Sequence, residues 1–342
     1  MIQQLQDIQS TLGATFDSIT VSSFGNDSAA LEAAENGVAL CDRTHWGVIK
    51  VTGGDRIRFL HNQSTNNFER LKPGEGCDTV FVTSTARTID LATALVTDDA
   101  VLLITSPNRY KYLIEWLDRY IFFADKVELT DITDKTAIFS LIGTESDSLL
   151  AKVGLDAIIG QPLANHQLLN DMRIAVGSGL ATPGYTLIVP AENAANVWKM
   201  VVEAGAVPMG DFIWEQLRIK QGRPVPEQEL TDDYNPLEAG LLQTISFDKG
   251  CYIGQETIAR LNTYKGVKQN LWGIKLNAIA EIGSVIMVGE EKVGKLTSIV
   301  ESDRSFFGLG YIRTKAGGAG LIVQIGETTG EVVEVPFLSR PQ

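Results

Sequence analysis

The last 75 residues constrain the fold more than any other part of the chain. From Lys268 onward, short β-rich runs alternate with glycines. Short strands at even spacing, joined by glycine-containing turns, are typical of a small antiparallel barrel or sandwich. We therefore expect a β-domain over residues 268–342. The runs are Leu271–Leu276, Val285–Val288, Lys295–Val300, Leu309–Ile312, Leu321–Ile325 and Val332–Val335.

The preceding residues mix helices and strands without strict alternation. Helices are expected where apolar residues recur at helical spacing between capping residues and glycine or proline. Strands are expected in short runs rich in β-branched residues. This pattern predicts an α+β organisation. The expected helices cover residues 2–12, 27–36, 55–62, 107–120, 197–204 and 211–220, and the expected strands cover 48–51, 127–132, 137–142, 173–176 and 185–189.

The charge distribution limits the partners. The chain has 29 Lys and Arg against 42 Asp and Glu, a net charge of −13. The 75 residues from Lys268 onward carry eight of each sign, so the excess lies in residues 1–267. An acidic surface gains no counterion release from polyanions, so we expect neither nucleic acid nor an anionic membrane as partner. The apolar runs, such as Val101–Ile104, are far shorter than the roughly 18 residues of a membrane span.

The cysteines and the N-terminus indicate the compartment. Cys41, Cys77 and Cys251 are odd in number and far apart, which favours a reducing compartment over a disulfide scaffold. The first basic residue is Arg43, so the start of the chain lacks the charges of a secretory signal or transit peptide. We expect a cytoplasmic protein.

Metal-binding patterns are missing from the sequence. The histidines are His45, His61 and His166, and neither His-Glu-x-x-His nor Cys-x-x-Cys occurs. We therefore expect no stably bound metal. His61 is expected on a helix surface.

The segment Lys249-Gly-Cys-Tyr-Ile-Gly-Gln-Glu256 is the most informative stretch for chemistry. A helix beginning at Gln255 and the charge of Lys249 would both favour the thiolate of Cys251. Gly250 and Gly254 would allow the backbone to approach a flat ligand closely. Two plainer interpretations remain: a free cysteine is often a small buried apolar residue, and Gln255 and Glu256 could be ordinary first-turn residues.

A second cluster, Arg218-Ile-Lys-Gln-Gly-Arg-Pro224, contains three cations at the end of an expected helix. These cations could satisfy the last carbonyl groups of the helix and interact with its negative pole. They could also bind a carboxylate, which the overall charge would otherwise repel. Arg218 is therefore a candidate ligand-binding residue.

Several stretches together resemble the YgfZ-type folate-binding proteins, relatives of the glycine cleavage T-protein. The octapeptide Lys249–Glu256 is similar to the signature of that family. Five further stretches resemble the same family more weakly. In chain order they are Phe59–Asn66, Leu71–Gly74, Leu217–Pro224, Asn235–Glu238 and Gly308–Ile312.

The resemblance implies three domains in a ring around a central folate channel. These would be two α+β lobes, the first discontinuous in sequence, and a C-terminal antiparallel β-barrel. We place the first lobe at residues 1–47 and 132–246, the second at 48–131, a signature and connecting segment at 247–267, and the barrel at 268–342.

The resemblance also implies a ligand and site residues. The ligand would be tetrahydrofolate or a one-carbon derivative. The residues lining or shaping its pocket would be Lys249, Gly250, Cys251, Gly254, Gln255 and Glu256, with Cys251 as the reactive thiol.

Two positions depart from the T-protein pattern. Lys220 stands where the T-protein has a carboxylate that reads the pterin, so that role would fall to Glu215 or Glu256. In Ala86-Arg-Thr-Ile-Asp-Leu91, a leucine replaces the second acid of an Asp-Asp pair. A positioned acid would handle charge and protons at the reacting nitrogen, so its loss weakens the case for aminomethyl transfer.

Three hypotheses follow. The first is a tetrahydrofolate-binding protein that supports iron–sulfur cluster assembly or repair through Cys251, with iron–sulfur enzymes or assembly factors as partners. The second is a folate-dependent one-carbon transferase, either an aminomethyltransferase or a demethylase. The third is a folate-responsive scaffold without chemistry, in which Cys251 would be a core residue.

Overall fold

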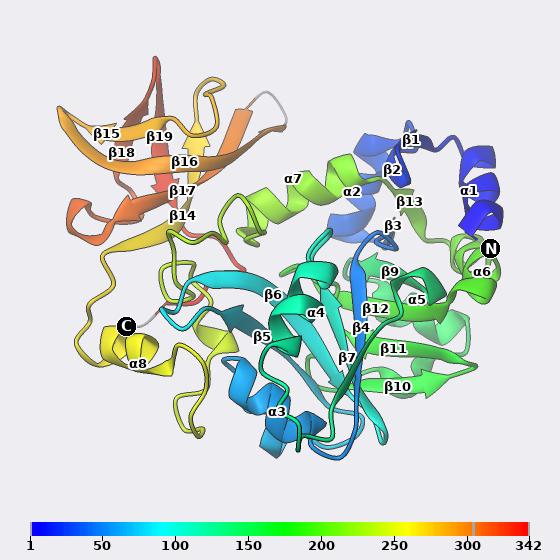
Figure 1. Cartoon of the computed structure of the whole chain (residues 1–342). Helices are drawn as coiled ribbons and strands as arrows, with labels where there is room; N and C mark the ends of the chain where they lie inside the picture. Colours follow the sequence, from blue (N-terminus) through cyan, green and yellow to red (C-terminus); the bar gives the residue numbers. More distant parts are fainter. Residues whose placement is uncertain (1, 303–304, 341–342) are drawn as a thin grey trace. The chain divides into compact units, whose positions relative to one another are not determined.

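The computed structural model describes residues 2–302 and 305–340 (Figure 1). The chain divides into two compact units. The first unit contains residues 1–60, 68–78 and 92–214, and the second contains 61–67, 79–91 and 215–342. The ring, its central channel and the three-domain limits expected from the sequence stay predictions.

A six-stranded sheet lies in the first unit. Its strands are antiparallel, except that β13 runs parallel to the edge of β3. The helices α1 (Ile2–Thr11), α5 (Ser146–Lys152) and α6 (Ala194–Glu203) contribute to the apolar core of this sheet, and α1 packs on α6. Helix α2 (Asp27–Asn36) packs against β13, β3 and β9. In sheet order the strands are β10 (His166–Leu169), β11 (Met172–Val176), β12 (Gly184–Pro190), β9 (Thr136–Ile142), β3 (Ala39–Asp42) and β13 (Val207–Met209).

A hairpin and a second sheet complete the strands before the barrel. The hairpin joins β1 (Thr15–Asp17) to β2 (Thr20–Ser23). The sheet has five strands, and α4 (Tyr110–Asp118) packs against two of them, β4 and β8. In sheet order they are β5 (Gly76–Val82), β6 (Thr88–Val96), β7 (Ala100–Thr105), β4 (Gly47–Thr52) and β8 (Glu128–Asp131).

The C-terminal strands form a closed antiparallel barrel, which confirms the sequence prediction. Gly294 shows why glycines punctuate these strands: a Cβ atom there would lie 2.0 Å from the Tyr311 carbonyl oxygen on the neighbouring strand. The strands, in barrel order, are β14 (Gln269–Leu276), β17 (Ser305–Arg313), β16 (Glu291–Ser302), β15 (Val285–Val288), β18 (Ile322–Ile325) and β19 (Thr328–Val333).

The predicted helices form, with shifts at their ends. The expected helix over residues 107–120 begins only at Tyr110, because Asn108 has a left-handed backbone (φ 59°) that a helix cannot include. The sequence analysis missed several strands that precede the barrel, namely β1, β2, β3, β5, β6, β7, β10 and β13. Eight of the nine residues of β6 are buried, so the strand lacks the alternation by which one-sided strands are recognised. The other helices are α3 (Arg56–Gln63), α7 (Asp211–Gln221) and α8 (Gln255–Thr263).

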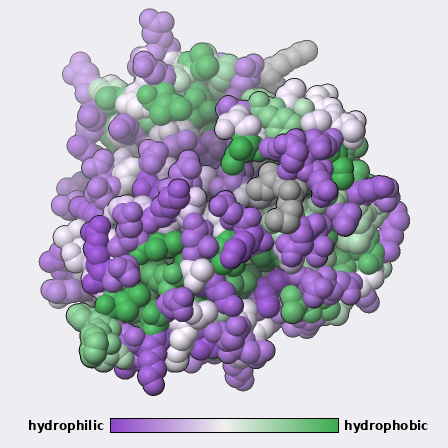
Figure 2. All heavy atoms as spheres, turned by 45° about the vertical axis from the view of Figure 1, so that its right-hand side comes forward, coloured by the Kyte–Doolittle hydropathy of each residue, from purple (hydrophilic) through white to green (hydrophobic). Residues whose placement is uncertain are grey.

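The surface is mainly polar. On the face drawn in Figure 2, hydrophilic residues predominate and hydrophobic residues form separate patches. Phe122 and Phe123, which follow α4, are among the most exposed large apolar side chains. Among the described residues, no helix combines the length and the apolar character that a membrane crossing requires.

Candidate functional site

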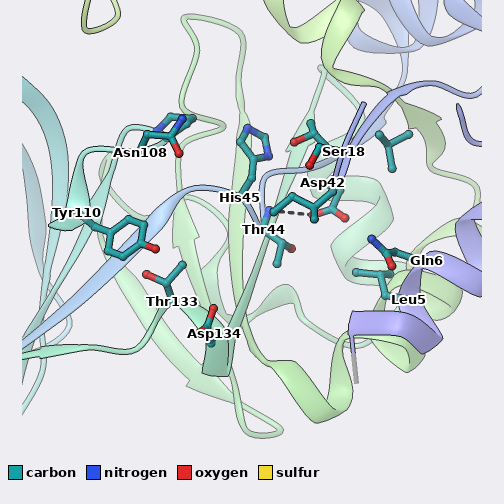
Figure 3. A pocket seen from close by; sticks show the side chains of 14 residues that line it. Leu5, Gln6, Ser18, Asp42, Thr44, His45, Asn108, Tyr110, Thr133 and Asp134 are labelled. Carbon is teal, nitrogen blue, oxygen red and sulfur yellow. Dashed lines mark hydrogen bonds between the residues drawn. The ribbon is translucent and has the colours of Figure 1, made fainter. Parts of the chain in front are cut away.

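A cavity of about 380 Å³ lies in the first unit (Figure 3). Its walls come from α1, the β1–β2 turn, the residues after β3, the segment before α4 and the short 3-10 helix η2 (Thr133–Lys135). None of the site residues predicted from the sequence lines it. Those residues lie in the second unit, which is described next.

The signature segment is an irregular loop that leads into α8. Its backbone is held at both ends by one neighbouring stretch of chain, residues 61–67. The Ser246 amide donates to the Thr65 carbonyl at 3.0 Å, and the Ile253 amide donates to the Asn62 carbonyl at 3.1 Å. The loop therefore has a fixed path although it lacks regular secondary structure.

Lys249 holds the centre of this loop in place through hydrogen bonds to main-chain carbonyls. Its ammonium donates to the carbonyl oxygens of Ser64 and Asn66, each at 2.7 Å, and also to that of His61. These carbonyls lie at and just beyond the end of α3, where helix carbonyls lack internal partners and attract cations. The side chain is buried, and its charge lies 4.7 Å from the ring centre of Tyr252. The ammonium is thus engaged with the protein itself, and its predicted contact with folate stays a prediction.

Cys251 is exposed. Its two neighbours in the loop that carry large side chains, Lys249 and Tyr252, are both buried. The plainer interpretation of Cys251 as a buried apolar residue is therefore wrong. The cysteine lies three residues before Gly254, which is the N-cap of α8, so the thiol precedes the helix rather than forming part of its first turn.

Gly254 seats the start of α8 on the turn after β5. Its φ of 81° is left-handed, and a Cβ atom there would lie 2.8 Å from the Thr83 carbonyl oxygen and 2.9 Å from the Val82 side chain. Only glycine allows both this conformation and this approach. Gly250 is different, because a Cβ atom there would meet only the His61 Nε2 atom, at an ordinary 3.7 Å.

His61 lies beside the signature loop. It is 3% exposed, so the expectation that it lies on the surface of a helix is wrong. Its carbonyl accepts from Lys249, and its imidazole lies next to Gly250. Sequence reasoning missed this neighbour of the signature loop, because His61 precedes Lys249 by 188 positions.

Gln255 and Glu256 occupy the first turn of α8, as expected. Gln255 is half-buried and Glu256 is exposed. The Gln255 amide donates to the Tyr252 carbonyl at 3.2 Å. The next amides of a helix's first turn lack partners within the helix, so this end of α8 offers donors beside an amide and a carboxylate. Such a donor and acceptor set suits the edge of a pterin ring, which has both donors and acceptors.

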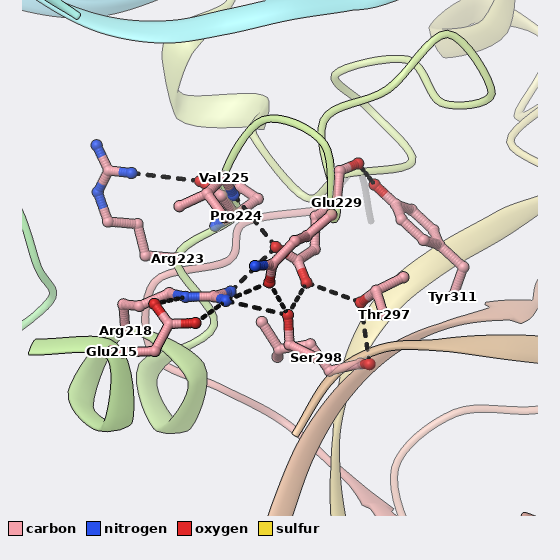
Figure 4. A network of polar contacts seen from close by, with 11 residues as sticks. Glu215, Arg218, Arg223, Pro224, Val225, Glu229, Thr297, Ser298 and Tyr311 are labelled. Carbon is pink, nitrogen blue, oxygen red and sulfur yellow. Dashed lines mark hydrogen bonds and ion pairs between the residues drawn. The ribbon is translucent and has the colours of Figure 1, made fainter. Parts of the chain in front are cut away.

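Arg218 lies in a buried polar network in the second unit (Figure 4). Its guanidinium pairs with Glu229 at 3.0 Å, with Glu215 at 2.7 Å from Nε, and donates to Ser298 at 3.1 Å. Both Arg218 and the Glu229 side chain are completely buried. The network joins α7 to the barrel strand β16 and satisfies the cation with protein groups. Capture of a folate carboxylate by Arg218 stays a prediction.

The acids considered as pterin readers have separate surroundings. Glu215 is paired with Arg218, whereas Glu256 is exposed. Leu91, at the position of the second T-protein acid, is 2% exposed in an apolar cluster that includes Tyr252 and Ile258. That position therefore serves core packing.

Glu238 is a second titratable residue that sequence reasoning left without a role. It is 6% exposed, and burial raises the pKa of its carboxyl group although the carboxylate accepts the Asn235 amide at 3.2 Å. Nearby, the Arg87 guanidinium donates to the Asp233 carbonyl at 2.8 Å, and the Thr88 amide donates to the Tyr234 carbonyl at 3.0 Å. The 86–91 stretch thus contacts the segment that contains Glu238.

The second unit therefore brings several of the stretches that carry the family resemblance together, whereas Leu71–Gly74 lies in the first unit. The 61–66 stretch contacts the signature loop through Lys249, and Ala86, Leu91, Leu230 and Leu237 share an apolar cluster with Tyr252 and Ile258. Within the part of the chain that the structure describes, no group of three or more metal-ligating side chains occurs.

Comparison with known proteins gives one consistent result. Residues 21–249 match the family model described as the GCVT N-terminal domain. The chain is 49% identical to a chloroplastic protein of Arabidopsis thaliana named only as a candidate transferase, over 98% of this chain and 79% of the relative. It is 27% identical to the aminomethyltransferase of Halalkalibacterium halodurans, over 90% and 89% of the two chains.

A solved structure has the same fold. The glycine cleavage system aminomethyltransferase T from Bartonella henselae superposes with a TM-score of 0.88, and the match covers 98% of each chain at 17% identity. The similarity in fold thus extends over nearly the whole chain.

Proposed function

This chain belongs to the family of the GCVT N-terminal domain, and from that premise we propose that it binds tetrahydrofolate or a one-carbon derivative and supports iron–sulfur cluster assembly or repair through Cys251. Iron–sulfur enzymes or their assembly factors would be its partners. The proposed compartment is the cytoplasm, although the name of the Arabidopsis relative places that protein in the chloroplast.

The observation that carries this proposal is the exposed thiol on an anchored loop. Cys251 is exposed, whereas Lys249 and Tyr252 on either side are buried and the backbone is hydrogen-bonded at both ends. Thiolates are the preferred protein ligands of iron–sulfur clusters and the nucleophiles of disulfide exchange. A fixed, accessible thiol suits exchange with a partner protein.

Folate binding is supported by the residues at the start of α8. Gln255 and Glu256 would hold the pterin, and Gly250 and Gly254 would give the backbone the required path. Lys249 and Arg218, whose charges are paired within the protein, would shape the pocket. A bound folate would supply a one-carbon carrier.

The environment of Leu91 favours this proposal over aminomethyl transfer. Its side chain lies in an apolar cluster, where an ionised carboxylate would be costly to bury. The position therefore does not supply the acid that the T-protein pattern places near the reacting nitrogen.

A folate-dependent one-carbon transferase is the second candidate function. Two observations favour it: the relatives named as aminomethyltransferases, and the fold shared with aminomethyltransferase T. Release of 5,10-methylenetetrahydrofolate from an aminomethylated carrier or an N-methyl substrate would promote it above the first proposal.

The first proposal is tested by the activity of iron–sulfur enzymes in cells. In a strain lacking this protein, the wild-type chain should restore those activities and Cys251→Ser should not. Cys77→Ser, at a half-buried cysteine, is the matched control and should behave as wild type. Full restoration by Cys251→Ser would remove the thiol from the function.

A further inference from the structure

The cavity in the first unit differs in chemistry from a folate site. None of its lining residues is a lysine or an arginine. It contains two carboxylates instead, Asp42 and Asp134. Folate carries carboxylates of its own, which this cavity would repel.

Asp42 is held in a fixed orientation. Its Oδ1 atom accepts the Thr44 amide at 2.8 Å, and its Oδ2 atom accepts the Gln9 side-chain amide at 2.7 Å. Each carboxylate oxygen has a further lone pair, so two bonds leave capacity for a ligand. Figure 3 shows Asp42 and Thr44 together at the cavity wall, joined by this hydrogen bond.

The neighbouring basic groups do not cancel this negative charge. Burial, together with Arg43, lowers the pKa of His45 to about 4, so its imidazole is neutral at pH 7. The Arg43 guanidinium lies 4.7 Å from the ring centre of Trp46 and 4.8 Å from that of Trp214, and it donates to Thr186 at 3.0 Å. Its guanidinium is therefore engaged with two aromatic rings and a hydroxyl group of the unit.

The remaining walls combine apolar surface with neutral polar groups. Leu5, Val21 and Pro107 provide the apolar surface. Tyr110 lies across the cavity from Gln6, and its hydroxyl points toward Thr133 (Figure 3). A short hydrocarbon chain could pack between these walls while a charged end met a carboxylate.

We propose that this cavity is a binding site for a small organic ammonium compound, with the ammonium group facing Asp42 and Asp134. Its volume of about 380 Å³ suits a metabolite-sized ligand. An ammonium group donates three hydrogen bonds and is attracted to carboxylates, whereas an anion would be repelled. None of its lining residues belongs to the proposed folate site.

Three four-carbon probes that differ in charge test this proposal. Putrescine is a dication, 1,4-butanediol is neutral and succinate is a dianion. Isothermal titration of the whole protein at pH 7 should show that putrescine binds. The affinity for butanediol should be lower by about tenfold or more, and succinate should give no heat of binding. Absence of putrescine binding, or equal binding of putrescine and butanediol, would overturn the proposal.

Variants locate the binding. Asp134 is exposed, so the Asp134→Asn variant should fold normally, and its affinity for putrescine should be about tenfold lower than that of wild type. An Asp42→Asn variant whose melting temperature matches wild type should show the same loss of affinity. Asp156→Asn, at an exposed aspartate outside the cavity, is the matched control and should bind like wild type. Unchanged affinity in Asp134→Asn would place the ligand elsewhere and contradict the proposal.

Discussion

Lys249 is a buried cation whose ammonium donates to main-chain carbonyls. Three such oxygens, from His61, Ser64 and Asn66, surround its ammonium. Buried charges are tolerated only where hydrogen bonds replace the lost hydration. The lysine therefore positions the loop that carries Cys251.

Lys249→Met should destabilise the protein by about 3 kcal/mol, because it leaves buried carbonyl oxygens without a donor. Urea denaturation measures this change. Lys292→Met, at an exposed lysine in the barrel, is the control and should change stability by less than about 0.5 kcal/mol. Equal effects of the two substitutions would show that the carbonyl contacts do not hold the loop.

Glu238 should make stability depend on pH. Burial raises its pKa above 4.5, so the folded state binds its proton more tightly than the unfolded state. The sign follows from proton linkage: stability falls as pH rises from about 4.5 through the raised pKa. Removal of the charge should therefore stabilise the protein at pH 7 and have less effect at pH 4.5.

Glu238→Gln keeps an oxygen that can accept the Asn235 amide, so it isolates the charge. The difference in unfolding free energy between this variant and wild type should grow from pH 4.5 to pH 7. Glu256→Gln, at an exposed position, should show no such growth. A difference for Glu238→Gln that is independent of pH would contradict this account.

At the level of single residues, the sequence could not show the partners of the side chains it singled out. It placed Lys249 beside the thiol, but its carbonyl partners are 183 to 188 positions earlier in the chain. Only the tertiary fold determines which carbonyls meet the ammonium. The same separation concealed the contact between His61 and Gly250.

Helix α8 is positioned by the glycine at its start. In Gly254→Ala, the new Cβ atom would sit on a left-handed backbone and 2.8 Å from the Thr83 carbonyl oxygen. We expect this substitution to lower the free energy of unfolding by about 2–4 kcal/mol. Gly160→Ala has a similar φ of 78° with open space around the position, and should cost only about 1 kcal/mol. Urea denaturation of both variants separates the conformational cost from the collision. Equal losses of stability in the two variants would mean that the 83–87 turn moves aside and that the close contact has no cost.

The Arg218 network joins α7 to strand β16. Arg218→Met would leave the buried Glu229 without its cation. We therefore expect this substitution to lower the free energy of unfolding by about 3–5 kcal/mol. Adding Glu229→Gln should recover part of this loss. The exposed pair Arg313–Glu291, at 3.9 Å, offers the contrast, because Arg313→Met should cost at most about 1 kcal/mol. A cost for Arg218→Met as small as that for Arg313→Met would contradict the assigned role.

At the level of elements, local patterns predicted the barrel strands and most helices. The helix starting at Gln255 and the glycine-separated runs after Lys268 depend on neighbouring residues, so sequence reasoning could find them. Strand β6 escaped, because burial on both faces removes the alternating pattern. The network around Arg218 escaped as well, since its members come from distant segments.

At the level of the whole molecule, fold and family are consistent. The chain shares a fold with aminomethyltransferase T over nearly its full length. The sequence resemblance implies that Leu91 and Lys220 stand where the T-protein pattern has acids. The family resemblance rested on short stretches far apart in sequence, and the second unit brings several of them together. We infer that the folate-binding framework is retained and that the chemistry has shifted toward the thiol.

The most direct test of this account is isothermal titration of the wild-type protein with tetrahydrofolate, alongside a Gln255→Ala/Glu256→Ala variant of unchanged melting temperature. The account predicts saturable binding to wild type and weaker binding by about tenfold or more in the variant. An absence of heat with wild type, or equal affinity in the two proteins, would contradict folate binding at the start of α8.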